Sequence, residues 1–130
     1  MKKMIMVYVA GAYSAPTKEG IEENCRRARE VGVRLAAVSP RVFPVIPHQT
    51  GRDIEHIGDY QFWIEGTLEL MRRCDVVFAI RGWTNSKGAV GEVQEANRLG
   101  IPVIDGDPPG TFEEAAQELV EAGLARVQAA

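Results

Sequence analysis

The chain has 130 residues, of which 45% are hydrophobic and 25% are charged, and its formal net charge is −3. Such a length and composition are typical of one soluble globular domain, so residues 1–130 are expected to form a single domain with one core. The acidic balance argues against a nucleic-acid partner, and no run approaches the roughly 20 apolar residues of a membrane helix, so neither partner is expected.

The first half of the chain alternates between predicted strands and helices. The continuous apolar run at 4–10 is typical of a strand buried on both faces, and 18–37 repeats apolar residues at the spacing of a helix. Residues 41–47 predict a short strand near a sheet edge, because two prolines interrupt it. The polar stretch 48–59 is long for a connection, which indicates a lid or wall over a site.

The second half continues this alternation. Residues 59–74 predict an amphipathic helix and 75–80 a second fully buried strand, and a loop at 81–88 then leads to a helix at 89–99 that Gly100 ends. The elements expected after it are a strand at 101–105, a turn at 106–110, a helix at 112–123 that Thr111 caps, and an optional short strand at 124–128.

This order of elements predicts parallel βαβ units with right-handed crossovers. The expected fold is a small, doubly wound, flavodoxin-like α/β sandwich of three layers. Its parallel sheet would hold four or five strands in the order 2-1-3-4, with the optional strand as the fifth. Ligands of such sheets bind beyond the carboxyl ends of the strands, where the strand order reverses. The loop at 11–16 and the loop at 81–88 are therefore expected to form one pocket.

The loop after the first strand offers Gly11, Tyr13 and Ser14 as candidate substrate-binding residues. Gly11 allows the backbone to approach a ligand, Tyr13 can stack on a planar ring, and Ser14 can bind a sugar or phosphate oxygen. The alternative is an ordinary turn with an exposed tyrosine. The chain contains neither the G-x-G-x-x-G pattern of dinucleotide sites nor the P-loop pattern, and no cofactor is expected.

The second pocket loop carries the candidate catalytic residue. Asn85 and Ser86 precede a helix whose N-terminal amides favour an anion, and Gly88 removes a side chain that would block a ligand. Glu92 borders the apolar face of this helix, where an ionised carboxylate can attack a sugar carbon through an oxocarbenium-like transition state. The helix dipole predicts a low pKa for Glu92 unless burial raises it. The alternative is a solvated surface charge.

Other residues give weaker signals. Trp83 lies in the second pocket loop and is a candidate to stack on a base, whereas Trp63 falls on an apolar helix stripe and is expected in the core. No metal site is expected, because the polar residues of the long loop fit no metal-binding spacing: His48, Asp53, His56 and Asp59.

The N-terminus and the cysteines bear on the compartment. Lysines before a short apolar run form a weak signal-peptide pattern, but the β-branched residues and Tyr8 favour a buried strand. Cys25 and Cys74 show no CxxC spacing, and each falls within a helical pattern. Reduced thiols and a cytoplasmic location are therefore expected.

Three blocks of the sequence resemble a known family. They are YVAGAYS at 8–14, WIEGTLELMRRCDVV at 63–77 and GWTNSKGAVGEVQEANRLGIPV at 82–103. Together they resemble the nucleoside 2-deoxyribosyltransferase superfamily, and in particular a small bacterial and phage branch with a GW-x-x-S-x-G-A-x-x-E signature. That branch is related to the 2′-deoxynucleoside 5′-phosphate N-hydrolases. The resemblance implies a flavodoxin-like fold, a homodimer or larger homo-oligomer, and cleavage of the N-glycosidic bond of a (deoxy)nucleoside or its 5′-monophosphate.

The resemblance also implies roles for single residues. Glu92 falls on the family's nucleophilic glutamate, and Gly11 and Tyr13 fall on the loop that lines the base and sugar. Ser86 falls where deoxyribosyltransferases often carry an aspartate that holds the sugar, and it matches the serine with which the nucleotide N-hydrolases bind phosphate. Because an aspartate would repel a 5′-phosphate that Ser86 beside Lys87 would accept, a monophosphate is favoured over a free nucleoside.

One position departs from the family pattern. Members usually carry an aspartate on the second long helix that assists the leaving base or orients the nucleophile, and this chain has Thr67 there. Thr67 lies on the side of the helix that carries the apolar stripe, so its side chain is expected to face the pocket. Asp59, Asp53 or His48 could supply the missing acid, since general acid–base help contributes roughly 10²–10⁴-fold.

Two classes of function therefore remain open. The first is an N-glycosidase or deoxyribosyltransferase that uses Glu92, and the second is a non-catalytic nucleotide-binding module that has lost its acid partner. A phosphoribohydrolase of the cytokinin-activating type is disfavoured, because the segment NSKGAVGE at 85–92 lacks the glycine pair of that family.

Overall fold

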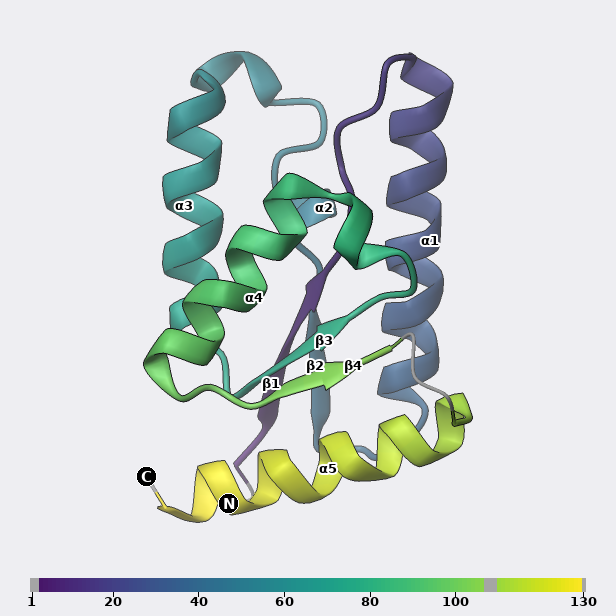
Figure 1. Cartoon of the computed structure of the whole chain (residues 1–130), viewed down its shortest axis with the longest axis vertical. Helices are drawn as coiled ribbons and strands as arrows, with labels where there is room; N and C mark the ends of the chain where they lie inside the picture. Colours follow the sequence, from purple (N-terminus) through teal and green to yellow (C-terminus); the bar gives the residue numbers. More distant parts are fainter. Residues whose placement is uncertain (1–2, 107–109, 130) are drawn as a thin grey trace.

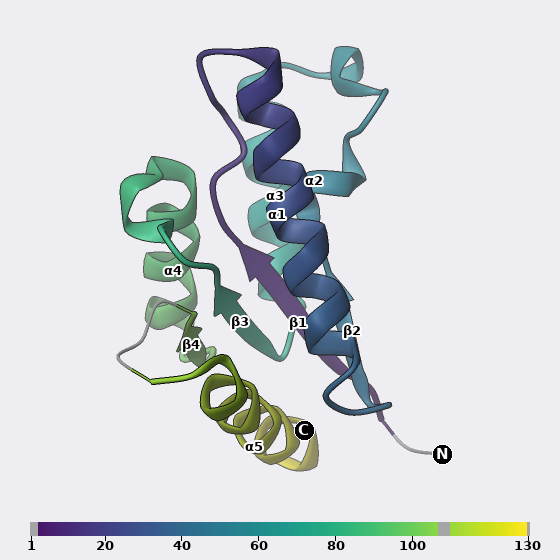
Figure 2. The same cartoon turned by 90° about the vertical axis from the view of Figure 1, so that its right-hand side faces the viewer.

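The computed structural model describes residues 3–106 and 110–129, and its centre is a parallel four-stranded sheet with helices on both faces (Figures 1 and 2). The strands are β1 (Ile5–Ala10), β2 (Val42–Val45), β3 (Val76–Ala79) and β4 (Val103–Asp105). Their order is β2-β1-β3-β4, and every neighbouring pair is parallel. The flavodoxin-like α/β fold and the strand order expected from the sequence are thus confirmed.

Four long helices surround the sheet, and their ends follow local sequence signals. The helices are α1 (Lys18–Ala36), α3 (Tyr60–Arg72), α4 (Lys87–Leu99) and α5 (Phe112–Ala129). The hydroxyls of Thr17 and Thr111 accept backbone N–H groups at the starts of α1 and α5, as N-caps do. Gly100 ends α4 with a φ of 74°, a left-handed conformation that favours glycine. The ends at Gly100 and Thr111 were predicted.

Two expectations require correction. Residues 124–128 belong to α5, so the optional fifth strand is wrong. Val127 continues the helical spacing of Leu119 and is buried against the sheet, and this packing favours the helix. The long polar stretch is not a bare loop, since it contains the short helix α2 (Pro47–Thr50) and the 3₁₀ turn η1 (Glu55–Ile57). The predicted turn at 106–110 falls largely outside the described residues.

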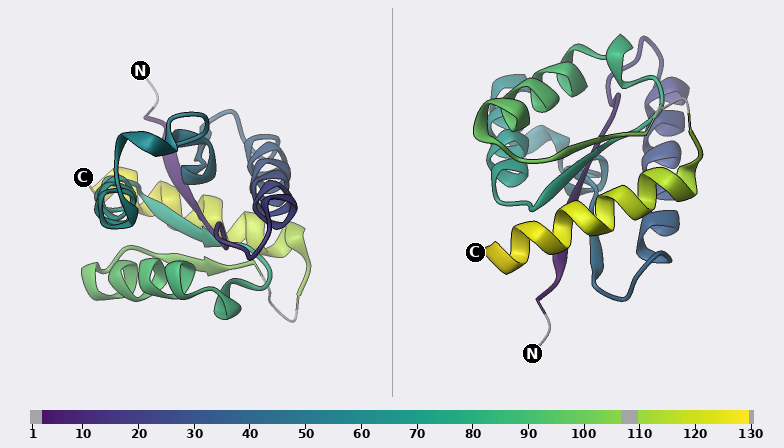
Figure 3. Two further views of the ribbon diagram at one scale, coloured as in Figure 1. Left: turned by 90° about the horizontal axis from the view of Figure 1, so that it is seen from above. Right: turned by 60° about the horizontal axis from the view of Figure 1, so that its bottom comes forward.

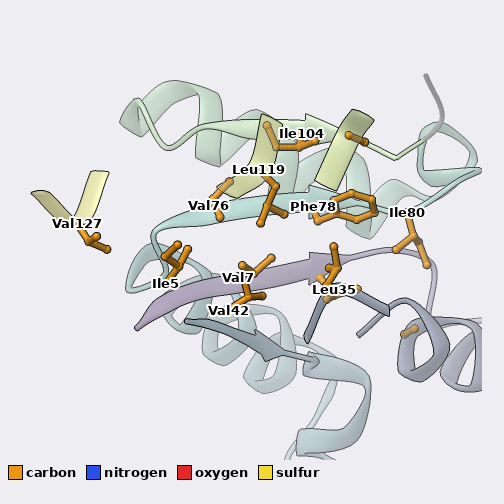
Figure 4. Packing of buried hydrophobic residues seen from close by; sticks show 13 residues of the cluster. Ile5, Val7, Leu35, Val42, Val76, Phe78, Ile80, Ile104, Leu119 and Val127 are labelled. Atoms are coloured by element: carbon orange, nitrogen blue, oxygen red, sulfur yellow. The ribbon is translucent and has the colours of Figure 1, made fainter. Parts of the chain in front are cut away.

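The two faces of the sheet carry different helices. Along β1, Ile5, Val7 and Val9 point into a core shared with α1 and α5, which Figure 4 shows at close range. Tyr8 and Ala10 point the opposite way, into a second core shared with α3 and α4. This alternation is the normal geometry of a strand buried on both faces.

The edge of the sheet where β1 and β3 end positions the site. The two strands are parallel neighbours, with Ala10 opposite Ala79, so the loops that follow them leave from the same edge (Figure 3). The second of these loops contains the 3₁₀ turn η2 (Trp83–Asn85) and leads directly into α4. The helices α1 and α3 also begin beyond this edge (Figure 1). Residues far apart in the sequence are therefore brought together there.

Candidate active site

A cavity of about 810 Å³ opens at this edge of the sheet. The loops after β1 and β3 both contribute to its wall, through 11–14 and 85–88, as the sequence predicts. A third part of the wall comes from the segment between β2 and α3, which includes Pro47, His48 and Glu55. The expectation that the long polar stretch forms a wall over a site is confirmed.

Glu92 lies on the cavity wall and pairs with a residue that the sequence did not single out. It projects from the second turn of α4, and the hydroxyl of Tyr8 donates a hydrogen bond to its Oε2 atom. Tyr8 is fully buried in the middle of β1 and is separated from Glu92 by 84 positions. The carboxylate is therefore held by a side chain that emerges from the sheet itself.

Burial controls the acidity of this pair. Removal of Glu92 from water raises its pKa to about 7, although the hydrogen bond from Tyr8 opposes the shift. Burial and the nearby charge of Glu92 raise the pKa of Tyr8 far above its usual range, so the phenol remains protonated as the donor. The low pKa that the helix dipole alone would give Glu92 is not found, because desolvation outweighs the dipole.

Thr67 lies beside this pair, and its predicted inward orientation is confirmed. Its hydroxyl donates to the carbonyl of Trp63, one turn earlier in α3, at 2.9 Å. The same hydroxyl interacts with the phenol of Tyr8, and Thr67 lines the cavity. The position at which the sequence pattern leads one to expect an acid thus adjoins the Tyr8–Glu92 pair.

The start of α4 presents groups suited to an anion. Ser86 is the N-cap of the helix, and its Oγ accepts the backbone N–H of Ala89 at 3.2 Å. Ser86, Lys87 and the preceding Asn85 all line the cavity. A lysine beside a helix N-terminus favours a negatively charged group. Capping and ligand binding by Ser86 remain compatible.

Two glycines keep this end of α4 open. A side chain at Gly91 would meet no atom within 4 Å, and one at Gly88 would come no closer than 3.9 Å to the Ser86 Oγ. Both glycines line the cavity. A larger residue at either position would therefore take up space in the cavity, in line with the room that the sequence predicts at Gly88.

The loop after β1 is held in place from three sides. A side chain at Gly11 would overlap that of Ile80, which would then have to move, so Gly11 packs closely against Ile80. The Nδ2 of Asn24, on α1, donates to the carbonyls of Tyr13 and Ser14 at 3.0 and 3.4 Å. His48 supports the loop from α2. The loop therefore presents Tyr13 and Ser14 to the cavity from a fixed backbone.

Residues 5–105 match the sequence model of a domain of unknown function, DUF4406. The chain belongs to this family. No curated protein sequence matches it. A similar solved structure is that of a conserved protein from Enterococcus faecalis V583, with a TM-score of 0.64 and 19% identity over 78% of this chain and 62% of that protein. At this identity the likeness supports the fold alone, and the DUF4406 chain spans less than two thirds of that protein.

Neither tryptophan of this DUF4406 chain takes its expected place. Trp63 lines the cavity and donates from Nε1 to the carbonyl of Glu55 at 3.1 Å. Trp83 lies outside the cavity wall, and its Nε1 donates to Oδ1 of Asp105, at the end of β4, at 3.1 Å. Trp63 precedes Thr67 by one helical turn, a spacing that could have placed it on the pocket-facing side.

The three residues considered as substitutes for the missing acid differ in their position relative to the cavity. His48 and Asp59 lie on the cavity wall, whereas Asp53 does not. Asp59 is the N-cap of α3, where its Oδ1 accepts the backbone N–H of Phe62 at 2.9 Å. His48 is buried, and this burial lowers its pKa, which favours the neutral ring over the charged acid.

Neither a metal-binding cluster nor a membrane-spanning helix is present in the described part of the DUF4406 chain. Within 3–106 and 110–129, no three His, Cys, Asp or Glu side chains are grouped so that they could hold a metal ion. No helix in those ranges is long and apolar enough to cross a membrane. Cys25 and Cys74 are buried free thiols.

Proposed function

We propose that this protein cleaves the N-glycosidic bond of a (deoxy)nucleoside 5′-monophosphate, with the carboxylate of Glu92 as nucleophile. The observation that carries the proposal is the Glu92 carboxylate, held by a buried phenol on the wall of a cavity at the ligand-binding edge of the sheet. The resemblance of three sequence blocks to the nucleoside 2-deoxyribosyltransferase superfamily supports the same reaction class.

The chemistry needs few groups. The ionised carboxylate forms a bond to C1′ while the C1′–N bond breaks, and the electron pair of that bond leaves with the base. Water then bonds to C1′, the ester bond to Glu92 breaks, and the proton released by the water balances the departed base. A second base in place of water would give transfer instead of hydrolysis. Because burial raises the pKa of Glu92 to about 7, both its reactive ionised form and its protonated form are populated near neutral pH.

The preference for a 5′-monophosphate rests on the start of α4. Ser86, Lys87 and the helix N-terminus combine a hydroxyl, a positive charge and oriented backbone dipoles on the cavity wall. An aspartate in the place of Ser86 would oppose a phosphate at this position, whereas a serine hydroxyl can donate to one. A free nucleoside remains the alternative substrate.

A second candidate function is a nucleotide-binding module without catalysis. Thr67 favours it, because a threonine hydroxyl that donates to the carbonyl of Trp63 does not act as a carboxylic acid at neutral pH. Binding and catalysis then differ only in whether the bond to the base is broken.

The test measures free base released from a panel of nucleosides and their 5′-monophosphates, in ribo and deoxy forms, by liquid chromatography. The deciding variant is Glu92→Gln, and Glu118→Gln on the outer side of α5 is the matched control, since Glu118 is exposed and remote from the cavity. We expect base release from the unsubstituted protein and from the control. Glu92→Gln should lose activity on the order of 10⁴-fold or more, as nucleophile removal does.

Two results would overturn the enzymatic proposal. If no substrate releases base but a nucleotide raises the melting temperature, the binding module is the correct function. If Glu92→Gln retains base release, another residue is the nucleophile. A free nucleoside cleaved faster than its monophosphate would overturn only the preference for phosphate.

We also propose that the protein assembles as a homodimer or a larger homo-oligomer, as the sequence resemblance implies. Apolar side chains at the start of α3 and before it support a contact surface there, because Ile57, Tyr60 and Phe62 are 55%, 65% and 48% exposed. Sedimentation of the purified protein tests this, and a monomer at all micromolar concentrations contradicts it.

A further inference from the structure

His48 is a buried polar residue without a role in the proposed chemistry. It lies in α2, only 4% of its surface is exposed, and it forms part of the cavity wall. The thiol of Cys25, on α1, lies 3.9 Å from its backbone carbonyl. Imidazole groups are costly to bury unless their polar atoms are used, so the partners of the ring need an explanation.

One nitrogen of the ring is committed to the loop after β1. The Nε2 atom lies 3.2 Å from the carbonyl oxygen of Gly11 and 3.0 Å from that of Ala12. Carbonyl oxygens only accept hydrogen bonds, so Nε2 must carry the proton. The buried Nδ1 has no partner among the described residues, which fits a bare lone pair on a neutral ring. The structure therefore assigns both the tautomer and the direction of the contact.

Together, His48 and Asn24 contact the first four carbonyls of this loop. The His48 ring serves positions 11 and 12, and the Asn24 amide serves positions 13 and 14. Four successive carbonyls thus accept from two side chains, one on α2 and one on α1. A segment fixed at four consecutive peptide groups loses little further freedom when a ligand binds.

We propose that His48 is a positioning residue whose Nε2–H holds the backbone at 11–14, so that Tyr13 and Ser14 are preset at the cavity wall before a ligand arrives. The effect on ligand binding rests on the proposed function. The effect on the loop does not, because it concerns the ligand-free protein.

The kinetic test compares two substitutions at this position. His48→Gln keeps an amide N–H that can reach the place of Nε2, whereas His48→Leu keeps the bulk and removes the donor. We expect His48→Leu to raise KM for a nucleoside 5′-monophosphate roughly five- to tenfold with a smaller change in kcat, and His48→Gln to restore most of the loss. Gln49→Leu, at the next position of α2 and outside the cavity wall, is the control and should change neither constant.

The structural test needs no activity. Hydrogen–deuterium exchange of the ligand-free protein should show faster exchange of the amides at 11–15 in His48→Leu than in His48→Gln or Gln49→Leu. In the unsubstituted protein, nitrogen NMR of the His48 ring at neutral pH should show a protonated Nε2 and an unprotonated Nδ1. Because the NMR measurement uses the unsubstituted protein, it tests whether Nε2 is the donor even if His48→Leu does not fold.

The proposal is overturned by the opposite tautomer, by a charged ring at neutral pH, or by equal loop exchange in the Leu and Gln variants. If no substrate is cleaved but the exchange and NMR results are as expected, the proposed function fails and the positioning role stands. If activity is present but KM is unchanged in His48→Leu, the positioning role fails and the proposed function stands.

Discussion

Both faces of β1 pack against helices, but they differ in chemistry. Ile5, Val7 and Val9 are fully buried against α1 and α5, in a core made of apolar side chains. Tyr8 is equally buried on the other face, yet its hydroxyl meets the carboxylate of Glu92 from α4. One strand therefore supplies an apolar core on one side and the anchor of a candidate nucleophile on the other.

This difference separates the source of stability from the source of reactivity. Apolar burial contributes roughly 25 cal/mol per Å² and gains from close packing. A buried carboxylate costs free energy, and hydrogen bonding only partly offsets the cost. The buried carboxylate of Glu92 therefore lowers the stability of the fold on the side of Tyr8, and its pKa is near neutrality. Changes on the two faces should consequently alter different properties.

The largest expected effect is on the apolar face. Leu119→Ala, in α5, should lower the free energy of unfolding by roughly 3 to 4 kcal/mol, because it leaves a cavity against fully buried neighbours. Urea unfolding measures the loss. The pH dependence of base release should remain as in the unsubstituted protein. A shift of that profile would show that the two faces are coupled.

The next effect is the pH dependence of stability that Glu92 confers. Its pKa is about 7 in the folded protein and 4.5 when unperturbed, so the folded state binds more protons between these values. Stability should therefore fall as pH rises from about 4.5 to 7, by an amount on the order of 3 kcal/mol. The free energy of unfolding, measured at several pH values across this range, should depend less on pH in Glu92→Gln than in the unsubstituted protein. The same pH dependence of the free energy of unfolding in both proteins would contradict a raised pKa for Glu92.

A third prediction concerns the position beside the pair. Thr67→Asp places a carboxyl group next to Tyr8 and Glu92, and Thr67→Asn is its uncharged match. If the missing acid limits the reaction, the aspartate variant should release base up to roughly 10²-fold faster, since a general acid protonates the leaving base. Initial rates near pH 6 provide the comparison. Equal rates in both variants would mean that protonation of the base is not limiting.

The smallest expected effect follows from removing one hydroxyl. Tyr8→Phe deletes the donor that lowers the pKa of Glu92, so this pKa should rise further and the acidic limb of the rate profile should move to higher pH. The free energy of unfolding should change by about 1 kcal/mol, the value of one hydrogen bond. Met6→Leu, on the same face of β1, should leave the profile in place. If the acidic limb of the pH–rate profile is unchanged in Tyr8→Phe, Tyr8 does not influence the pKa of Glu92.

Much of the fold follows from local sequence patterns. The apolar runs at 4–10 and 75–80 identified the two central strands, and Gly100 and Thr111 marked helix ends. The fifth strand was wrong because a short apolar segment does not by itself distinguish a strand from the end of a helix. Only its packing against the sheet decided the matter.

The candidate site was predicted in part. The two loops, the inward side of Thr67 and the position of Glu92 at the cavity follow from the βαβ order and from helix periodicity. Tyr8 was missed because every residue of a strand buried on both faces looks like core in the sequence. Trp63 lines the cavity and Trp83 does not, contrary to both expectations, because the path of η2 and the packing of α3 are tertiary features.

The sequence by itself predicted the order of the strands, the edge of the sheet where the cavity lies, and Glu92 at that edge. These predictions depend on the alternation of strands and helices along the chain and on the periodicity within one helix. Only the tertiary structure decided that Tyr8 holds Glu92, that the pKa of this carboxyl is near 7, and that His48 and Asn24 fix the loop after β1. Each of these properties arises from groups distant in the chain, because desolvation and side-chain hydrogen bonds depend on what the folded chain brings together.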